Sequence, residues 1–116
     1  MTELSVILPV FDERDNLEIL YDELAQSLKA LATSYEVLFV DDGSTDGSCE
    51  VLAEIQSHDQ NVRVIELRRN FGQTAALAAG FDSAIGDIVV TMDADGQNDP
   101  KDIPLLLSDI ERGLDM

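Results

Sequence analysis

Two kinds of segment alternate along this chain. Short, nearly unbroken apolar runs are typical of strands buried on both faces, whereas apolar residues that recur every three or four positions are typical of amphipathic helices. The apolar runs lie at residues 4–9, 35–40, 62–67 and 88–92. The helical patterns lie around residues 17–31, 49–55, 74–84 and 101–112. The sequence therefore predicts strands and helices in regular alternation.

This alternation predicts an α/β fold, a doubly wound and mostly parallel sheet with helices on both faces and right-handed crossovers. Asp15 with Glu18 fits a capping box at the start of the first helix. If the strand order is 3-2-1-4, as in one half of a doubly wound nucleotide-binding fold, the loops after strands one, two and four surround the point where the order reverses. Open α/β sheets bind their ligands at that point.

Those three strand-end loops, residues 9–15, 41–46 and 93–97, are rich in oxygen donors. Mg²⁺ and Mn²⁺ prefer such donors, take one or two protein carboxylates and leave positions for phosphate oxygens. The candidate metal ligands are Asp93, Asp95 and Gln97. The alternative is that Asp95 and Asp99 build a tight turn and cap the last helix.

Two adjacent acids end the second strand. Asp41 and Asp42 repel each other unless a cation or a ligand rich in hydrogen-bond donors compensates their charge. The N–H groups of a nucleobase would do so. The alternative is a strand-to-helix turn in which Ser44 or Asp46 caps the second helix.

The densest positive charge lies between the third strand and the third helix. Arg69 and the turn at Gly72 could contact the base, ribose or phosphates of a ligand, whereas solvation of the surface explains Arg68 equally well. We interpret His58 as a surface residue and Cys49 as a core residue. A single cysteine excludes an internal disulfide.

The formal charge of −17, with 7 Lys and Arg against 24 Asp and Glu, argues against a nucleic-acid partner. No apolar run is long enough to span a membrane, and Met1–Val10 lacks the features of a signal peptide, so we expect these residues to be cytosolic. The 116 residues suit one domain. Gly113–Met116 resembles the start of a further apolar element, which suggests a piece of a longer protein.

Four ordered segments together resemble the family-2 inverting glycosyltransferases of the GT-A fold, most closely the branch of dolichyl- or polyprenyl-phosphate sugar synthases. The segments are SVILPVFDE (5–13), VDDGSTDG (40–47), RNFGQTAA (69–76) and MDADGQNDP (92–100). The resemblance spans nearly the whole chain and implies the nucleotide-binding half of a GT-A fold. Asp12 stands where Asn is common, and Gly96 where Leu is often found, so the subfamily stays open.

The resemblance also implies roles for individual residues. The nucleotide-binding residues would be Pro9, Phe11, Glu13, Asp41, Asp42, Arg69 and Gly72. Asp93, Asp95 and Gln97 would form the metal and diphosphate site, with Asp93 and Asp95 as catalytic residues. The metal would be Mg²⁺ or Mn²⁺.

The reaction implied is transfer of a hexose from a UDP- or GDP-linked sugar to a lipid phosphate at the cytoplasmic face of the membrane. On this hypothesis residues 1–116 are the donor-binding part of one domain, truncated at its carboxyl end. Two alternatives have other functions: a non-catalytic nucleotide-binding module, and a receiver-like signalling domain that binds Mg²⁺. A receiver domain would need a phosphorylatable Asp after the third strand, where this chain has Glu66-Leu67-Arg68.

Overall fold

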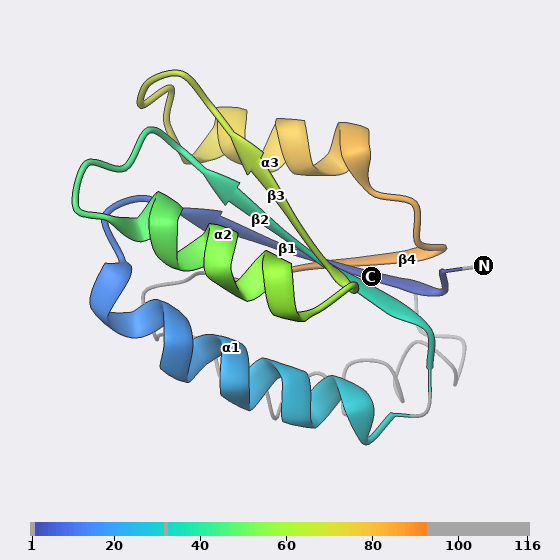
Figure 1. Ribbon diagram of the computed structural model, residues 1–116. Coiled ribbons are helices and arrows are strands. Elements are labelled where there is room, and N and C mark those ends of the chain that lie inside the picture. Colours follow the sequence, from blue (N-terminus) through green and yellow to red (C-terminus); the bar gives the residue numbers. More distant parts are fainter. Residues whose placement is uncertain (1, 32, 93–116) are drawn as a thin grey trace.

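A computed structural model describes residues 2–31 and 33–92, in which strands and helices alternate (Figure 1). The strands are β1 (Leu4–Val10), β2 (Tyr35–Asp41), β3 (Val62–Glu66) and β4 (Ile88–Thr91). The helices are α1 (Arg14–Lys29), α2 (Ser48–His58) and α3 (Gln73–Ser83). The four described strands pair in parallel in the order β3-β2-β1-β4, so the predicted fold class is confirmed and the strand order is the one on which the expected ligand edge depended. The helix predicted around residues 101–112 lies outside the described residues.

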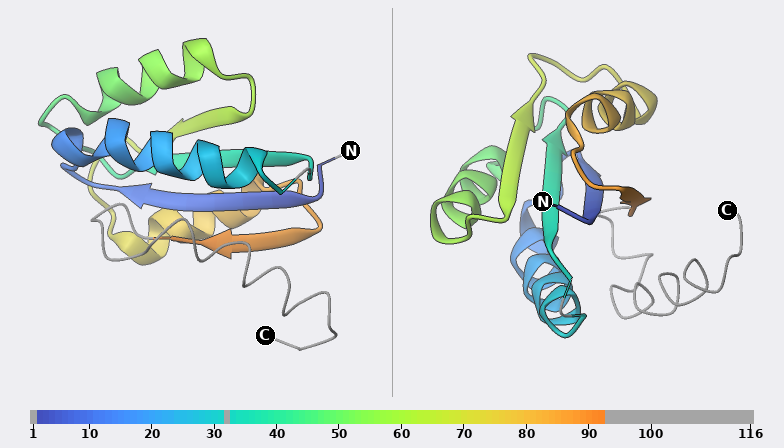
Figure 2. Two further views of the ribbon diagram at one scale, coloured as in Figure 1. Left: turned by 90° about the horizontal axis from the view of Figure 1, so that it is seen from below. Right: turned by 90° about the vertical axis from the view of Figure 1, so that its right-hand side faces the viewer.

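The sheet buries both of its faces. Successive strand residues point to opposite sides, so Val6 and Leu8 join the larger core cluster with α1 and α2, whereas Ile7 and Leu38 join the smaller cluster with α3. Figure 2 shows α1 and α2 on one side of the sheet and α3 on the other. This burial on both sides explains why β1 and β2 are nearly unbroken apolar runs in the sequence.

Helix α3 packs close against the sheet because its inner face carries small residues. Ala76 and Gly80 are both buried, and a Cβ atom added to Gly80 would lie 2.5 Å from Cγ2 of Ile7. A larger side chain at position 80 would push the helix away from β1. The alanine-rich sequence of this helix is therefore a consequence of the short distance between helix and sheet.

Helix α1 has 16 residues and buries the stripe of leucines that the sequence pattern predicts. Its N-cap is Glu13, and Asp15 lies inside the first turn, so the predicted capping box of Asp15 with Glu18 is wrong. The helix begins earlier because the N–H of Arg14 finds an acceptor in another loop, 3.1 Å away at Oδ2 of Asp46. Within residues 2–31 and 33–92, no helix combines the length and the apolar character needed to cross a bilayer.

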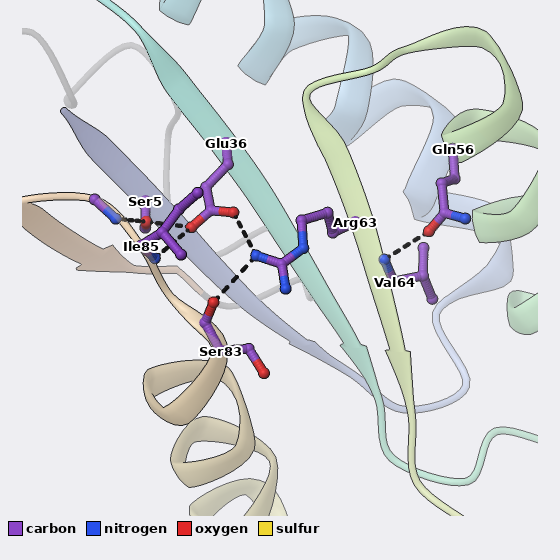
Figure 3. A network of polar contacts seen from close by, with 8 residues as sticks. Ser5, Glu36, Gln56, Arg63, Val64, Ser83 and Ile85 are labelled. Atoms are coloured by element: carbon purple, nitrogen blue, oxygen red, sulfur yellow. Dashed lines mark hydrogen bonds and ion pairs between the residues drawn. The ribbon is translucent and has the colours of Figure 1, made fainter. Parts of the chain in front are cut away.

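A buried carboxylate ties the turn between α3 and β4 to the amino-terminal ends of the strands (Figure 3). Glu36, 4% exposed, accepts hydrogen bonds from Oγ of Ser5 at 2.6 Å and from the N–H of Ile85 at 2.8 Å. Arg63 Nη1 lies 2.8 Å from Glu36 Oε1 and also donates to the carbonyl of Ser83 at 3.1 Å. These contacts join β1, β2, β3 and the residues that lead into β4.

The ionised form of Glu36 is favoured by these contacts. Burial alone would raise its pKa, but the hydrogen bonds from Ser5, Ile85 and Arg63 outweigh burial and hold the pKa below its ordinary value. A depressed pKa in the folded state means that the carboxylate stabilises the fold at pH values above its pKa in the unfolded chain. This contribution is lost as the pH falls through the folded pKa.

We expect Glu36→Gln to lower the free energy of unfolding at neutral pH by about 1–3 kcal/mol, because its amide nitrogen cannot accept the bonds that a carboxylate oxygen accepts. The difference from the wild type should shrink as the pH falls, because the wild-type side chain then also becomes neutral. Urea denaturation followed by circular dichroism at several pH values measures both effects. Glu23→Gln, at an exposed position of α1, is the matched control and should change the free energy by less than about 0.5 kcal/mol. Equal losses in the two variants would contradict the role of Glu36.

Candidate nucleotide site at the strand ends

The loops that follow β1, β2 and β3 lie together at the carboxyl ends of the strands (Figure 1). They comprise residues 11–13, 42–47 and 67–72. Hydrogen bonds connect the first loop to the second and the second to the third, as described below. The three loops therefore form one assembly at the edge of the sheet where α/β proteins bind ligands.

The first loop is held by side chains and backbone of the second. The N–H of Asp12 donates to Oγ of Ser44 at 2.9 Å, and Oδ1 of Asp12 accepts the N–H of Thr45 at 2.8 Å. The N–H of Glu13 donates to Oγ of Ser48 at 3.1 Å. The irregular backbone after β1 thus has its polar groups satisfied by the residues that lead into α2.

Asp12 adopts a left-handed backbone conformation, with φ of 52°. Among residues with a side chain, Asn and Asp enter this region most readily. The conformation gives a physical reason why Asn also suits this position, because its side-chain oxygen could accept the same bond from Thr45. Aspartate in place of asparagine at position 12 therefore preserves the geometry of the loop.

Asp46 links the starts of two helices. Its Oδ2 accepts the N–H of Arg14 at 3.1 Å, and its Oδ1 accepts the N–H of Ser48 at 3.0 Å and its hydroxyl at 2.5 Å. The bond from the Ser48 hydroxyl, aided by the backbone donors, lowers the pKa of Asp46. The N-cap of α2 is Gly47, so a capping role for Ser44 is wrong, whereas Asp46 satisfies the first N–H of α2 from just before the cap.

The second and third loops are joined through Asp42. This residue is 3% exposed, and its Oδ1 and Oδ2 accept the N–H groups of Phe71 at 2.8 Å and of Gly72 at 3.0 Å. Gly43, with φ of 75°, lies so near the third loop that a Cβ added to it would be 2.5 Å from the carbonyl carbon of Arg69. Backbone N–H groups therefore stabilise the negative charge of Asp42. Glycine at position 43 permits the second and third loops to approach each other closely.

Asp41 is also buried, 4% exposed, at the end of β2. Its Oδ1 accepts the N–H of Ser44 at 3.1 Å, and in the sheet it pairs with Glu66 at the end of β3. The adjacent acids Asp41 and Asp42 therefore bind different loops. Their predicted contacts with a nucleotide stay a prediction.

Among the other predicted nucleotide-binding residues, Pro9 is half-buried in β1 and Phe11 is 44% exposed. Glu13 is the N-cap of α1, and its Oε2 accepts a bond from Nδ2 of Asn16 at 2.8 Å. Arg69 is exposed, and its guanidinium carbon lies 4.9 Å from the centre of the Phe71 ring. The structure thus brings the predicted residues of the first three strands to one edge of the sheet.

The predicted metal ligands Asp93, Asp95 and Gln97 lie outside the described residues. The chain reaches Met92 at the same edge of the sheet, where its N–H donates to the carbonyl of Ile7 at 2.9 Å. In the ranges 2–31 and 33–92, no group of three or more His, Cys, Asp or Glu residues could hold a metal ion. The metal site therefore stays a prediction on residues 93–97.

The contacts of Ser48 and Phe71 were not predicted. Ser48, fully buried, joins the first loop to Asp46, and Phe71 is held by Asp42. A serine in the first helical turn is a weak local signal for such a role. Phe71 has no such signal, because its partner Asp42 follows β2 and lies 29 residues away in the sequence.

A cleft of about 190 Å³ between α1 and α2 is separate from this edge. Its lining residues are Glu18, Tyr21, Asp22, Val51, Glu54, Ile55 and His58. None of the predicted nucleotide-binding residues lines it. His58 is exposed at the end of α2, as predicted.

Cys49 is half-buried in the first turn of α2, and its thiol donates to the carboxylate of Glu66. The interpretation of Cys49 as a core residue is therefore wrong. The bond to Glu66, together with burial, raises the pKa of Cys49 to about 12. A thiol with such a pKa carries little thiolate at neutral pH.

We expect Gly43→Ala to destabilise the fold more than Gly47→Ala does. Both positions have positive φ, 75° and 95°, which costs about 1–2 kcal/mol for a residue with a Cβ. At position 43 the added atom also overlaps backbone of the third loop, which costs a further ~1–3 kcal/mol, whereas at position 47 it meets only the flexible side chain of Arg14. Chemical denaturation of the two variants measures the difference. A smaller loss for Gly43→Ala would contradict the close contact between the loops.

We expect Cys49 in the folded chain to react with a disulfide reagent at least roughly tenfold more slowly than in the urea-unfolded chain, because little thiolate is present. Glu66→Gln should accelerate the reaction by removing the negative charge that opposes ionisation. Absorbance of the released thiolate measures the rate, and Glu54→Gln, an exposed position further along α2, serves as the control. Equal rates in folded and unfolded chains would refute the interaction with Glu66.

The sequence matches glycosyl transferase family 2 over residues 5–116. The undecaprenyl-phosphate 4-deoxy-4-formamido-L-arabinose transferase of Proteus mirabilis is 43% identical over 117 residues, covering 100% of this chain and 36% of that protein. The dodecaprenyl-phosphate galacturonate synthase of Rhizobium johnstonii is 42% identical over 111 residues, covering 95% of this chain and 33% of that protein. The chain spans about a third of the length of these relatives.

Solved structures share the fold. S. aureus TarS 1-349 in complex with UDP-GlcNAc gives a TM-score of 0.77 at 22% identity, over 96% of this chain and 32% of that one. A mannosyltransferase from Pyrobaculum calidifontis in complex with GDP-Man and Mn²⁺ gives 0.69 at 27% identity, over 80% and 27% of the two chains. Both agree with the observed parallel sheet, and the family match extends over nearly all of the sequence. The chain therefore belongs to glycosyl transferase family 2.

Proposed function

We propose that this chain is the donor-binding part of a glycosyltransferase that transfers a sugar from a nucleoside diphosphate to a polyprenyl phosphate, with inversion at the anomeric carbon. The observation that carries the proposal is the similarity, at 43% and 42% identity, to relatives named for undecaprenyl and dodecaprenyl phosphate. The sugars in those two names differ, so the proposal covers a class of donor sugars. Residues 1–116 would be part of one domain of a longer protein that acts at the cytoplasmic face of the membrane.

The loops at the strand ends would bind the nucleotide. Carboxylates suit the N–H groups of a base and the hydroxyl groups of a ribose, and the buried acids Asp41 and Asp42 lie at the edge where such a ligand would bind. Each carboxylate oxygen has two lone pairs, so Asp42 can accept bonds from Phe71 and Gly72 and still accept one from a ligand. Pro9, Phe11 and Glu13 would border the base and ribose. Together with Gly72, Arg69 would lie along the nucleotide.

Residues Asp93, Asp95 and Gln97 would hold Mg²⁺ or Mn²⁺, with Asp93 and Asp95 as the catalytic residues. Two carboxylates and an amide oxygen form a donor set that suits a small hard cation and leaves positions for diphosphate oxygens. The mannosyltransferase with the same fold was solved with Mn²⁺, which supports a divalent ion here. When bound, the ion would offset the charge that develops on the diphosphate leaving group.

A lipid-phosphate acceptor would need little catalytic assistance from the described residues. A lipid phosphate is already anionic and can attack without a strong general base, whereas a hydroxyl acceptor would require one. The proposal therefore assigns no base to residues 2–31 and 33–92. Membership of glycosyl transferase family 2 removes the receiver-domain alternative, and a non-catalytic nucleotide-binding module is an outcome of the experiment below.

Calorimetric titration of UDP and GDP into the chain, with and without Mn²⁺, tests the donor site. We expect metal-dependent binding of at least one nucleotide, and Asp95→Ala should weaken it by about tenfold or more, because each ion of this type depends on one or two carboxylates. Asp82→Ala, at an exposed position near the end of α3, is the matched control and should bind like the wild type. We also expect sugar transfer by these 116 residues to be slow compared with a longer protein.

Failure of the wild type to bind either nucleotide would overturn the donor site in this chain. Binding that Asp95→Ala leaves unchanged would overturn the metal site alone. Nucleotide binding without sugar transfer in the longer protein would favour the non-catalytic module.

A further inference from the structure

Phe71 is an exposed aromatic residue on a tightly held backbone. Its side chain is 51% exposed, and exposure of a single apolar residue has no special meaning by itself. Its N–H, however, donates to the buried carboxylate of Asp42 at 2.8 Å, and the following N–H, of Gly72, donates to the other oxygen at 3.0 Å. The ring therefore projects from a point of the loop that is fixed to β2.

The preceding residues of this loop pack closely against the second loop. The backbone of Arg69 and Asn70 lies against Gly43, where an added Cβ would be 2.5 Å from both the carbonyl carbon of Arg69 and the nitrogen of Asn70. Asp42 binds residues 71 and 72, and Gly43 packs closely against residues 69 and 70. The backbone that carries the side chains of Arg69 and Phe71 therefore has a defined position at the strand ends.

The guanidinium group of Arg69 lies over the ring of Phe71, with Cζ 4.9 Å from the ring centre. An exposed arginine side chain ordinarily samples many rotamers, and ordering it has an entropic cost. A planar guanidinium stacks on an aromatic face, and the attraction restricts its orientation. The ring thus gives the arginine a preferred place before any ligand binds.

We propose that Phe71 is a positioning residue that acts through Arg69: its ring holds the guanidinium in the orientation that binds the nucleotide. This inference rests on the proposed function, because it assumes that Arg69 contacts the donor nucleotide. It assigns to Phe71 a part in donor affinity that differs from direct contact with the base. The ring and the guanidinium act as one unit.

A double-mutant cycle separates this mechanism from direct stacking of Phe71 on the base. If the ring acts through Arg69, the loss caused by Phe71→Leu disappears once Arg69 has been replaced. If the ring stacks on the base itself, the factors by which Phe71→Leu and Arg69→Ala each weaken binding multiply in the double variant. The cycle needs four proteins: the wild type, Phe71→Leu, Arg69→Ala and the double variant.

The measurement is the Kd of UDP and GDP by calorimetry in the presence of Mn²⁺. We expect Phe71→Leu to weaken binding about two- to fivefold, the range of an exposed cation–π contact. Arg69→Ala should weaken binding more, and the double variant should bind like Arg69→Ala. Phe71→Tyr, which keeps an aromatic face, should bind like the wild type.

Phe81→Leu is the matched control, since Phe81 is 53% exposed near the carboxyl end of α3, whereas the strand-end loop precedes the amino end of that helix. It should leave both Kd values unchanged. Unchanged binding by Phe71→Leu, or multiplying losses in the double variant, would overturn the positioning role and leave the donor site standing. No binding of either nucleotide by the wild type would overturn the donor site and this inference together.

Discussion

Two buried carboxylates at opposite ends of β2 hold helix α3 in place, and one of them, Asp42, also joins the strand-end loops. Asp42, just beyond the carboxyl end of β2, binds backbone N–H groups immediately before α3 begins. Glu36, near the amino end of β2, binds the N–H of Ile85 soon after α3 ends. Helix α3 presents mainly alanine and glycine to the sheet, so its apolar contacts are small. Hydrogen bonds at both ends therefore contribute strongly to fixing its position.

Hydrogen bonds from backbone N–H groups to carboxylates also explain how so acidic a chain forms ordered loops. With a formal charge of −17, it has far too few arginines and lysines to pair with its carboxylates. Asp41, Asp42 and Asp46 instead accept bonds from backbone N–H groups of Ser44, Phe71 and Arg14 and of neighbouring residues. Hydrogen bonds to a charged acceptor are stronger than neutral ones, and each satisfies a donor that irregular backbone would otherwise leave open.

The strands were predictable because each leaves a local signal in the sequence. The nearly unbroken apolar runs of β1 and β2 follow directly from burial on both faces, and alternating strands and helices restrict the sheet to a few topologies. The start of α1 was not predictable in the same way. Helix α1 begins at Arg14 because an acceptor 32 residues away, on Asp46, satisfies its first N–H.

In the candidate site, too, some features were predictable from the sequence and others were not. Acids at the ends of strands could be recognised from the sequence, because the end of an apolar run marks the edge of the sheet. The partners of those acids could not be recognised. The bond from Phe71 to Asp42 spans 29 residues, and the bond from Cys49 to Glu66 connects a helix to a strand. Neither contact leaves a periodic pattern in the sequence, so only the folded arrangement reveals it.

The bonds between loops also determine when the site becomes ordered. Asp12 and Ser44 connect the first loop to the second, and Asp42 and Phe71 connect the second to the third. The conformational entropy of these segments is therefore lost mainly on folding, and little of that loss remains for the step in which a ligand binds. Because the loops share their hydrogen bonds, a change in one of them alters the position of the others. Under the proposed function, residues of this edge would therefore influence nucleotide affinity as a coupled set, even where only some of them touch the nucleotide.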